Sequence, residues 1–397
     1  MQFDGSEIGV GAPGNLNPGA GGTGPIYVLP GCYLFLNSTT IAVPFTNQLY
    51  IAGCGDGSEP LGAVRGGIFA GPVTMIGDTD LGGGPTMLSA ISGPFNLTLG
   101  SEATVNGGAI LCNTNDNWTG NTTMVARNNT GNNTVTMSNS FVIPNGPGYG
   151  NVALEAFNGL GSVWWNLNGF NETINGLSTI NASLALGTTS VTNCVITNSV
   201  SATVSTLTLG NNDQSGLWGG NIAGGSSPGN GTINVTKIGA GVETLTNINT
   251  YVGTTTISNG VLQLIGGGSI ASSPTVTING GTFDVSSVAY TIPAAQNINV
   301  SGGTFFISTG TGSSGGLVNF TNGTLKIPTL SGSGNGSGTP SLTVPTLNIG
   351  GASNFILPAS MPPVPAYPAV YPVIQYTTLN GSVSTFSPVL PAGGFPA

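Results

Sequence analysis

The chain has 397 residues, of which 67 are glycine and only 4% are charged, while 39% are hydrophobic. This composition excludes a disordered polyelectrolyte and an ordinary globular protein with a charged surface. The net charge is −9 with only four lysines and arginines, too few to neutralise a phosphate backbone, so nucleic acid is excluded as a partner. No apolar run reaches the length of a membrane-spanning helix, and we expect no membrane span.

The two ends of the chain differ from its middle. Residues 1–30 are rich in glycine and proline, and residues 353–397 contain PASMPPVPAYPAVYP and PVLPAGGFPA. Proline cannot donate to a β-ladder. We therefore predict an N-terminal segment or cap at 1–30, β-structure at 31–352, and a C-terminal segment at 353–397 that caps the structure or joins subunits.

Four cysteines suit an oxidising, extracellular setting. Cys32 and Cys54 are separated by one length of the repeat found further along the chain, so we predict a disulfide between adjacent coils. Cys112 and Cys194 are separated by several lengths of that repeat. For these two, buried thiols and partners between subunits both remain open.

Two groups of carboxylates come closest to a catalytic pair: Asp78 with Asp80 in GDTD, and Asp56 with Glu59 in GDGSEP. A glycosidase needs two carboxylates, and a polysaccharide lyase needs a base with a cation. The chain has no histidine, and no lysine or arginine lies within ten residues of Asp78. We therefore expect polar turn residues or a weak Ca²⁺ contact, and predict no enzyme, no cofactor and no metal site.

A repeat of about 20–22 residues is the main structural signal. The segments ISNGVLQL, INGGTFDV, VSGGTFFI and FTNGTLKI align by their glycines, and SLTVPTLNI is taken as a fifth copy. Apolar and polar residues alternate within each copy, which indicates a strand with one buried face. Because glycine tolerates a positive φ, the aligned glycines are predicted to turn the chain at the same place in every coil.

The alignment predicts three inward-facing columns and one column of turn glycines. The first column is Ile257, Ile278, Val300, Phe320 and Leu342; the second is Leu262, Phe283, Phe305, Leu325 and Leu347; the third is Leu264, Val285, Ile307, Ile327 and Ile349; the glycines are Gly260, Gly281, Gly303 and Gly323.

Short strands with corners at a fixed period pair with the next coil rather than as local hairpins. We predict an all-β fold, a single elongated right-handed parallel β-helix (β-solenoid) with about 20–22 residues per coil.

Residues 237–264 resemble the autotransporter-associated β-strand repeat. The residues that carry the resemblance are Lys237, Gly239, Gly241, Thr244, Leu245, Asn249, Thr250, Tyr251, Gly253, Thr255, Gly260, Leu262 and Leu264. The resemblance implies a secreted β-helix, displayed on or released from a cell surface, with an adhesive or structural role.

These signals together predict an extracellular structural protein, secreted or on the cell surface, whose partner is itself. The terminal coils of a β-helix expose unpaired backbone groups, and contacts between them would build a filament, sheath or coat. The alternative is an adhesive passenger that binds a host or carbohydrate ligand. Trp164, Trp165, Tyr251 and Phe306 are the aromatic candidates for such a surface, but we expect packing in the core or between coils for them. A polysaccharide lyase or hydrolase ranks third.

Overall fold

The computed structural model describes residues 2–3, 8–9, 23–36, 44–55, 61–101, 107–126, 132–156, 161–180, 191–225, 230–358, 362 and 368–389. The chain divides into two compact units, Met1–Asn212 with Gly219–Ile233 (unit 1) and Asp213–Trp218 with Asn234–Ala397 (unit 2). The described residues form β-strands and two short 3-10 helices, η1 (Val191–Asn193) and η2 (Val383–Thr385), with no α-helix among them. The predicted all-β class is confirmed.

Unit 1 is built from parallel strands that pair from coil to coil. One sheet runs in the order β1 (Gln2–Phe3), β3 (Ile26–Val28), β5 (Leu49–Gly53), β8 (Val73–Gly82), β11 (Leu97–Ser101), β14 (Thr122–Ala126), β16 (Val152–Ala156) and β19 (Leu177–Thr179). Joined to it are β2 (Ile8–Gly9), β4 (Leu34–Phe35), β6 (Val64–Arg65), β10 (Ile91–Gly93) and β13 (Asn117–Trp118).

The second sheet of unit 1 runs in the order β23 (Asn221–Ile222), β20 (Cys194–Thr197), β17 (Ser162–Asn166), β15 (Asn132–Met137), β12 (Ile110–Leu111), β9 (Thr86–Met87) and β7 (Ile68–Phe69). A further parallel pair joins β18 (Glu172–Ile174) to β21 (Val204–Leu209).

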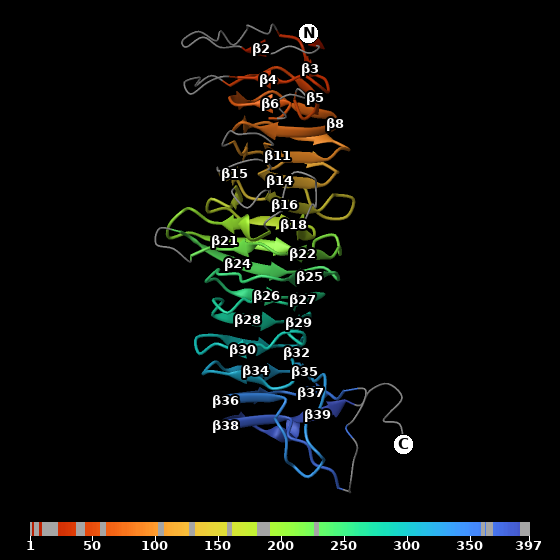
Figure 1. Cartoon of the computed structure of the whole chain (residues 1–397), viewed down its shortest axis with the longest axis vertical. Coiled ribbons are helices and arrows are strands. Elements are labelled where there is room, and N and C mark those ends of the chain that lie inside the picture. The colour runs from red at the N-terminus through yellow and green to blue at the C-terminus, as the bar shows by residue number, and fades with distance from the viewer. Residues whose placement is uncertain are drawn as a thin grey trace. The chain divides into compact units, whose positions relative to one another are not determined.

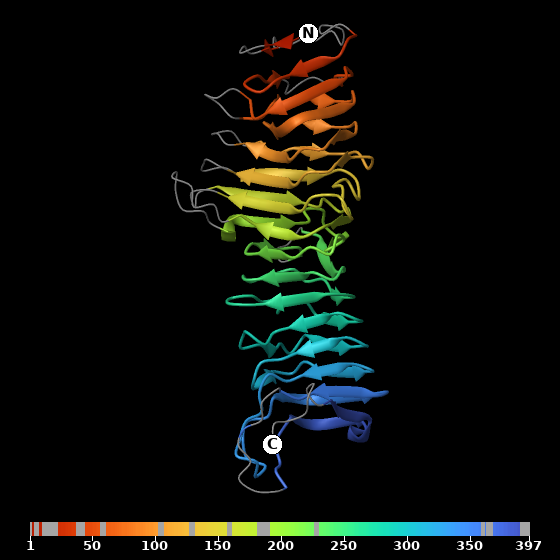
Figure 2. The same ribbon diagram turned by 90° about the vertical axis from the view of Figure 1, so that its right-hand side faces the viewer.

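Unit 2 contains two parallel sheets whose strands alternate along the chain. The first follows β24 (Thr232–Lys237), β26 (Thr255–Ile257), β28 (Thr275–Ile278), β31 (Asn297–Val300), β34 (Val318–Thr321), β36 (Leu342–Gly350) and β38 (Ile374–Gly381), with β30 (Thr291–Ile292) and β33 (Thr311–Ser313) joined at β36. The second follows β22 (Gly216–Trp218), β25 (Val242–Leu245), β27 (Val261–Leu264), β29 (Thr282–Asp284), β32 (Thr304–Phe306), β35 (Thr324–Lys326), β37 (Ser353–Ile356) and β39 (Phe386–Val389). Figures 1 and 2 show these strands of unit 2 as successive layers, the stacking expected of a parallel β-helix.

The register in unit 2 aligns the predicted core residues over four coils. Leu262 is the partner of Phe283, Phe283 of Phe305, and Phe305 of Leu325. All four side chains are buried, and the rings of Phe283 and Phe305 are stacked with their centroids 5.8 Å apart. The column Leu264, Val285, Ile307 and Ile327 is buried beside them. Burying one such side chain contributes roughly 1.5–3 kcal/mol, so these columns are a main source of stability.

The fifth copy is wrongly aligned by the sequence pattern. Leu347 and Ile349 pair with β34, and Leu342 pairs with β33, so all three lie in the first sheet of unit 2. Phe355 of β37 continues the second column instead. In this coil the turn glycines, Gly350 and Gly351, follow the segment LNI, whereas the alignment placed the turn before it. The alignment by glycines therefore fails at this copy.

Three of the four turn glycines serve a different purpose from the one predicted. Only Gly260 has a positive φ, of 60°. At Gly281, Gly303 and Gly323 the constraint is space, because a Cβ would lie 2.5–2.9 Å from a backbone oxygen of the preceding coil. These three glycines allow close approach between coils, and the left-handed residue is Gly302 or Asn322 just before.

Coil length varies more than the repeat predicts. Successive partners in the first sheet of unit 2 are Ile257, Ile278, Val300 and Phe320, which follow the predicted spacing, but the next partner, Ile349, lies well beyond it. In unit 1 the steps between partners from β11 through β14 and β16 to β19 are unequal, and each is longer than the predicted repeat. The strands stay in register because the additional residues lie in the connections between them.

Neutral side chains link successive coils on the outside. In unit 2 the side chains of Asn299, Asn319, Asn348 and Asn380 form a ladder in which each Nδ2 donates to the Oδ1 of the preceding asparagine. Hydrogen bonds between side-chain amides need no charge. Polar side chains on the surface can therefore be satisfied although the chain has few ionisable groups.

The predicted Cys32–Cys54 disulfide is not formed, and all four cysteines are thiols in the structure. The coil here is slightly longer than the separation of the two cysteines, since Ile26 is the partner of Leu49. Continued along the chain, that register places Cys54 against Gly31 rather than against Cys32. Cys194 is buried in β20, and burial raises the pKa of its thiol to about 12.

Candidate functional site

The predicted carboxylate pair lies on the outward face of β8. Asp78 and Asp80 flank the buried Thr79, so both point away from the core, as alternation along a strand requires. Asp78 accepts hydrogen bonds from the backbone N–H of Asn96 at 2.9 Å and from its Nδ2 at 3.2 Å. Its carboxylate therefore joins neighbouring coils.

Arg65, the cation nearest to this pair in sequence, is buried and contacts a turn and an aromatic ring. Its Nε donates to the carbonyl oxygen of Gly62 at 3.1 Å, and its guanidinium lies 3.7 Å from the ring centroid of Tyr33. The second predicted pair, Asp56 and Glu59, lies outside the described residues. No cluster of three or more metal-ligating side chains occurs within the described ranges, and no helix among them is long and apolar enough to cross a membrane.

Several polar side chains of residues 237–264, which carry the resemblance, are buried inside the coil. Lys237 is fully buried, and its Nζ donates to the backbone oxygens of Ile238 and of Gly239, the latter at 2.9 Å. Burial lowers the pKa of this ammonium group, while the charges of Glu243 and Asp213 oppose that shift. The lysine of the motif thus fixes a turn from inside the coil.

The aromatic and amide residues of the motif act in the same way. Tyr251 is fully buried, and its hydroxyl lies 2.7 Å from Oγ1 of Thr255, which in turn lies 3.0 Å from Oγ of Ser273 in the next coil. Asn249 accepts a hydrogen bond from Nε1 of Trp218 at 3.2 Å. The polar residues of the motif therefore hold successive coils together from the inside. Because Tyr251 is buried, it is not available to a ligand at the surface.

The other three aromatic candidates for a binding surface differ in exposure. Trp165 is buried in β17, and Phe306 is half-buried beneath the Nζ of Lys326. Trp164 is 38% exposed.

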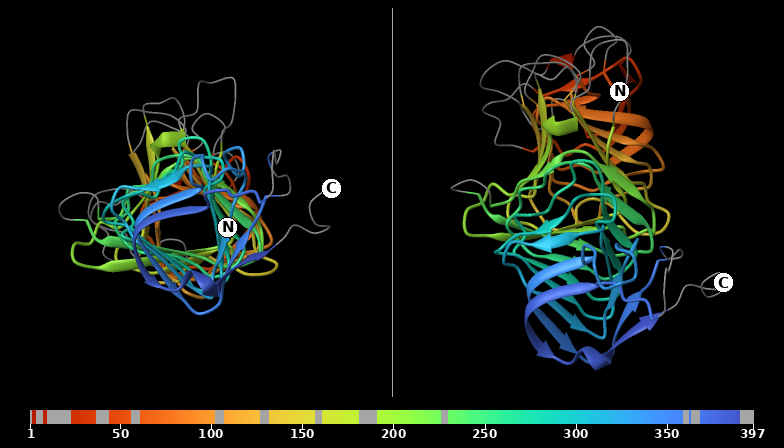
Figure 3. Two further views of the ribbon diagram at one scale, coloured as in Figure 1. Left: turned by 90° about the horizontal axis from the view of Figure 1, so that it is seen from below. Right: turned by 60° about the horizontal axis from the view of Figure 1, so that its bottom comes forward.

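The last coil of unit 2, formed by β38, η2 and β39, consists mostly of exposed residues. Strand β38 pairs with β36 and β39 pairs with β37, and no described strand pairs with the other edge of either. Figure 3 shows these strands, in blue, facing the viewer in the view from below. Their backbone N–H and C=O groups form an unpaired parallel edge.

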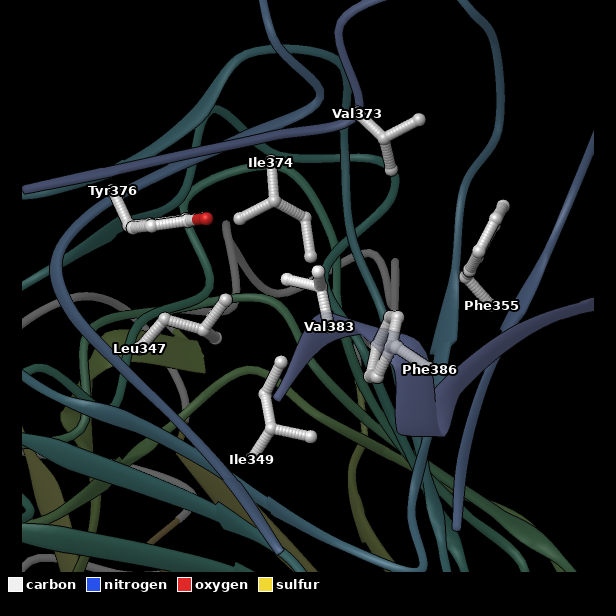
Figure 4. Close-up of a pocket in the computed structure, with 8 residues that line it drawn as sticks. All are labelled: Leu347, Ile349, Phe355, Val373, Ile374, Tyr376, Val383 and Phe386. Atoms are coloured by element: carbon white, nitrogen blue, oxygen red, sulfur yellow. The ribbon is translucent and has the colours of Figure 1, made fainter. Parts of the chain in front are cut away.

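An apolar cavity of about 170 Å³ opens at this coil. It is lined by Leu347, Ile349, Phe355, Val373, Ile374, Tyr376, Val383 and Phe386. Figure 4 shows Leu347, Ile374 and Val383 pointing toward one another across it. Tyr376 is 38% and Val383 53% exposed, whereas Val344, the partner of Tyr376 one coil earlier, is 2% exposed.

Sequence reasoning missed this coil because it assigned residues 353–397 to a proline-rich segment. Parallel pairing continues past residue 352 through β37, β38 and β39. The available signal was the likeness between TTLNGSVSTFSPV and the preceding PTLNIGGASNFIL. The outer boundaries at 1–30 and 390–397 lie largely outside the described residues.

Residues 235–264 match the family model of the passenger-associated-transport-repeat. Searches of curated proteins and of solved structures found no match. The chain therefore carries one passenger-associated-transport-repeat, which is consistent with the resemblance to the autotransporter passenger repeats.

Proposed function

We propose that this protein is an extracellular structural subunit that assembles end to end into a filament, sheath or surface coat. The observation that carries the proposal is the open last coil of unit 2. Its strand β38 is eight residues long and contains neither a charged residue nor proline, the features that blunt an exposed strand edge in monomeric proteins. An edge without such protection pairs readily with another chain.

The composition supports the same function. No charged side chain follows Lys326 in the sequence. Like charges therefore do not oppose contact between copies through this end of the chain. The cavity beside β38 is apolar, so covering it removes hydrophobic surface from water, which favours association.

We also infer that the protein is not an enzyme. Asp78 accepts hydrogen bonds from Asn96, and Arg65, the nearest cation in sequence, donates to a turn carbonyl and lies over the ring of Tyr33. The test is a turnover screen with acidic polysaccharides. Depolymerisation that disappears in Asp78→Asn would contradict the inference.

Adhesion is the second candidate function, and the exposed Trp164 on β17 favours it. A solvent-exposed indole offers a flat face for a sugar ring. Adhesion predicts saturable binding to a neutral glycan that is lost in Trp164→Ala. The neighbouring Trp165 is buried and is left unchanged in this variant.

Electron microscopy and sedimentation of the purified full chain over a range of concentrations test the leading function. We expect particles whose length grows with concentration. Monomers at every concentration would refute assembly, whatever surface is involved.

A further inference from the structure

The last coil of unit 2 offers two strand edges with an apolar interior between them. The edges belong to β38 and β39, which are joined through η2, and Val383 of η2 projects into the cavity between them (Figure 4). An extended peptide covers one edge at most. A partner that covers both edges and the interior together must itself be a coil with two strands and a corner.

The first coil of unit 1 has the matching arrangement. Strand β1 pairs with β3 and β2 pairs with β4, both in parallel, and no described strand pairs with their other edges. Four residues separate β1 from β2, and four separate β38 from β39. Stacking β1 on β38 therefore brings β2 to β39 without a change in corner length.

We propose that the last coil of unit 2 binds the first coil of unit 1 from a second copy of the chain, with β38 paired to β1 and β39 to β2 in parallel. This inference rests on the proposed function and names the surfaces that carry it. Pro388 lacks an N–H and so removes one donor from β39. Strand β38 contains no proline and keeps all of its N–H donors.

The two surfaces differ, so the contact is heterologous. Each bound copy leaves its own last coil available, and a contact of this kind that does not close produces a filament. A two-fold contact between two last coils would instead stop at a dimer.

The test places a charge at the open coil of the full chain. Val383→Asp changes a side chain that is 53% exposed, and Val204→Asp on β21 of unit 1 is the matched control, because Val204 is 56% exposed. Circular dichroism verifies that both fold, and Tyr376→Lys provides a second charge at the same coil should Val383→Asp be misfolded.

We expect filaments from the unmodified chain and from Val204→Asp, and loss of self-assembly in Val383→Asp. A Val383→Asp subunit keeps its first coil, so it still binds the last coil of an unmodified filament but accepts no further copy. Added to the unmodified chain, it should therefore shorten filaments in proportion to its mole fraction.

Each other outcome has a distinct meaning. Filaments formed by Val383→Asp and by Tyr376→Lys as readily as by the unmodified chain would overturn this inference and leave the proposed function standing. Dimers that stop growing, and that Val383→Asp abolishes, would identify the two-fold contact and also overturn it. An unmodified chain that stays monomeric would remove the proposed function, and this inference with it.

Discussion

Replacing Phe305 by alanine removes a fully buried ring from the second inward column of unit 2. Truncating a buried phenylalanine costs roughly 3–5 kcal/mol, through lost transfer free energy and the cavity left behind. The stacked contact with Phe283, at 5.8 Å between centroids, accounts for about 1 kcal/mol of this. We expect the free energy of unfolding of unit 2 to fall by about 4 kcal/mol.

Urea unfolding followed by circular dichroism measures the loss. With a slope of about 2 kcal/mol/M, the midpoint should fall by roughly 2 M. Phe306→Ala is the matched control, because that half-buried ring faces outward and contacts the Nζ of Lys326 at 4.0 Å; its loss should cost about 0.5–1 kcal/mol. Equal losses for the two variants would mean that the inward and outward faces of β32 are assigned wrongly.

Three further changes address other parts of the molecule. Burial raises the pKa values of Asp116 and Glu172 to about 8, so both carboxyls are protonated in the folded protein below that pH and ionised in the unfolded chain above about pH 4. The contribution of these two carboxyls to the stability of unit 1 should be complete below about pH 4, fall by up to about 1.4 kcal/mol per pH unit for each group as the pH rises, and be lost above about pH 8. Denaturation curves for Asp116→Asn and Glu172→Gln should show a shallower fall, and an unchanged slope would contradict this. Gly303→Ala places a Cβ 2.5 Å from a carbonyl oxygen of the preceding coil and should lower the melting temperature. Gly312→Ala, whose Cβ would have no atom within 4 Å, should leave the melting temperature unchanged. Similar shifts for both variants would argue against close approach as the reason for glycine at position 303. Lys237→Met removes the donor to two turn carbonyls and should cost about 1–3 kcal/mol in urea unfolding, and a neutral effect would show that the turn does not need it.

The columns of unit 2 were predictable because two local rules act together there. Alternation assigns Leu262, Phe283, Phe305 and Leu325 to one face, and a nearly constant step between glycines aligns them. The constant step failed at Leu347, where the chain inserts additional residues before the strand. Alternation persists in such a segment, but it cannot tell which of two sheets the strand joins.

The purpose of the glycines was also beyond sequence reasoning. A glycine that turns the chain and a glycine that admits a neighbouring backbone look the same in a sequence. Gly303 is of the second kind, because the carbonyl of Gly281 in the preceding coil occupies the space of its missing Cβ. Only the position of that coil distinguishes the two cases.

The sequence by itself determined the strand alternation, the pairing between coils and the buried columns, because these follow from local periodicity. The tertiary structure decided which residues of the last coil remain uncovered. Tyr376 is exposed where its partner one coil earlier, Val344, is buried, because no further described coil packs against Tyr376. Exposure at such an edge depends on what packs against it, which no short stretch of sequence records.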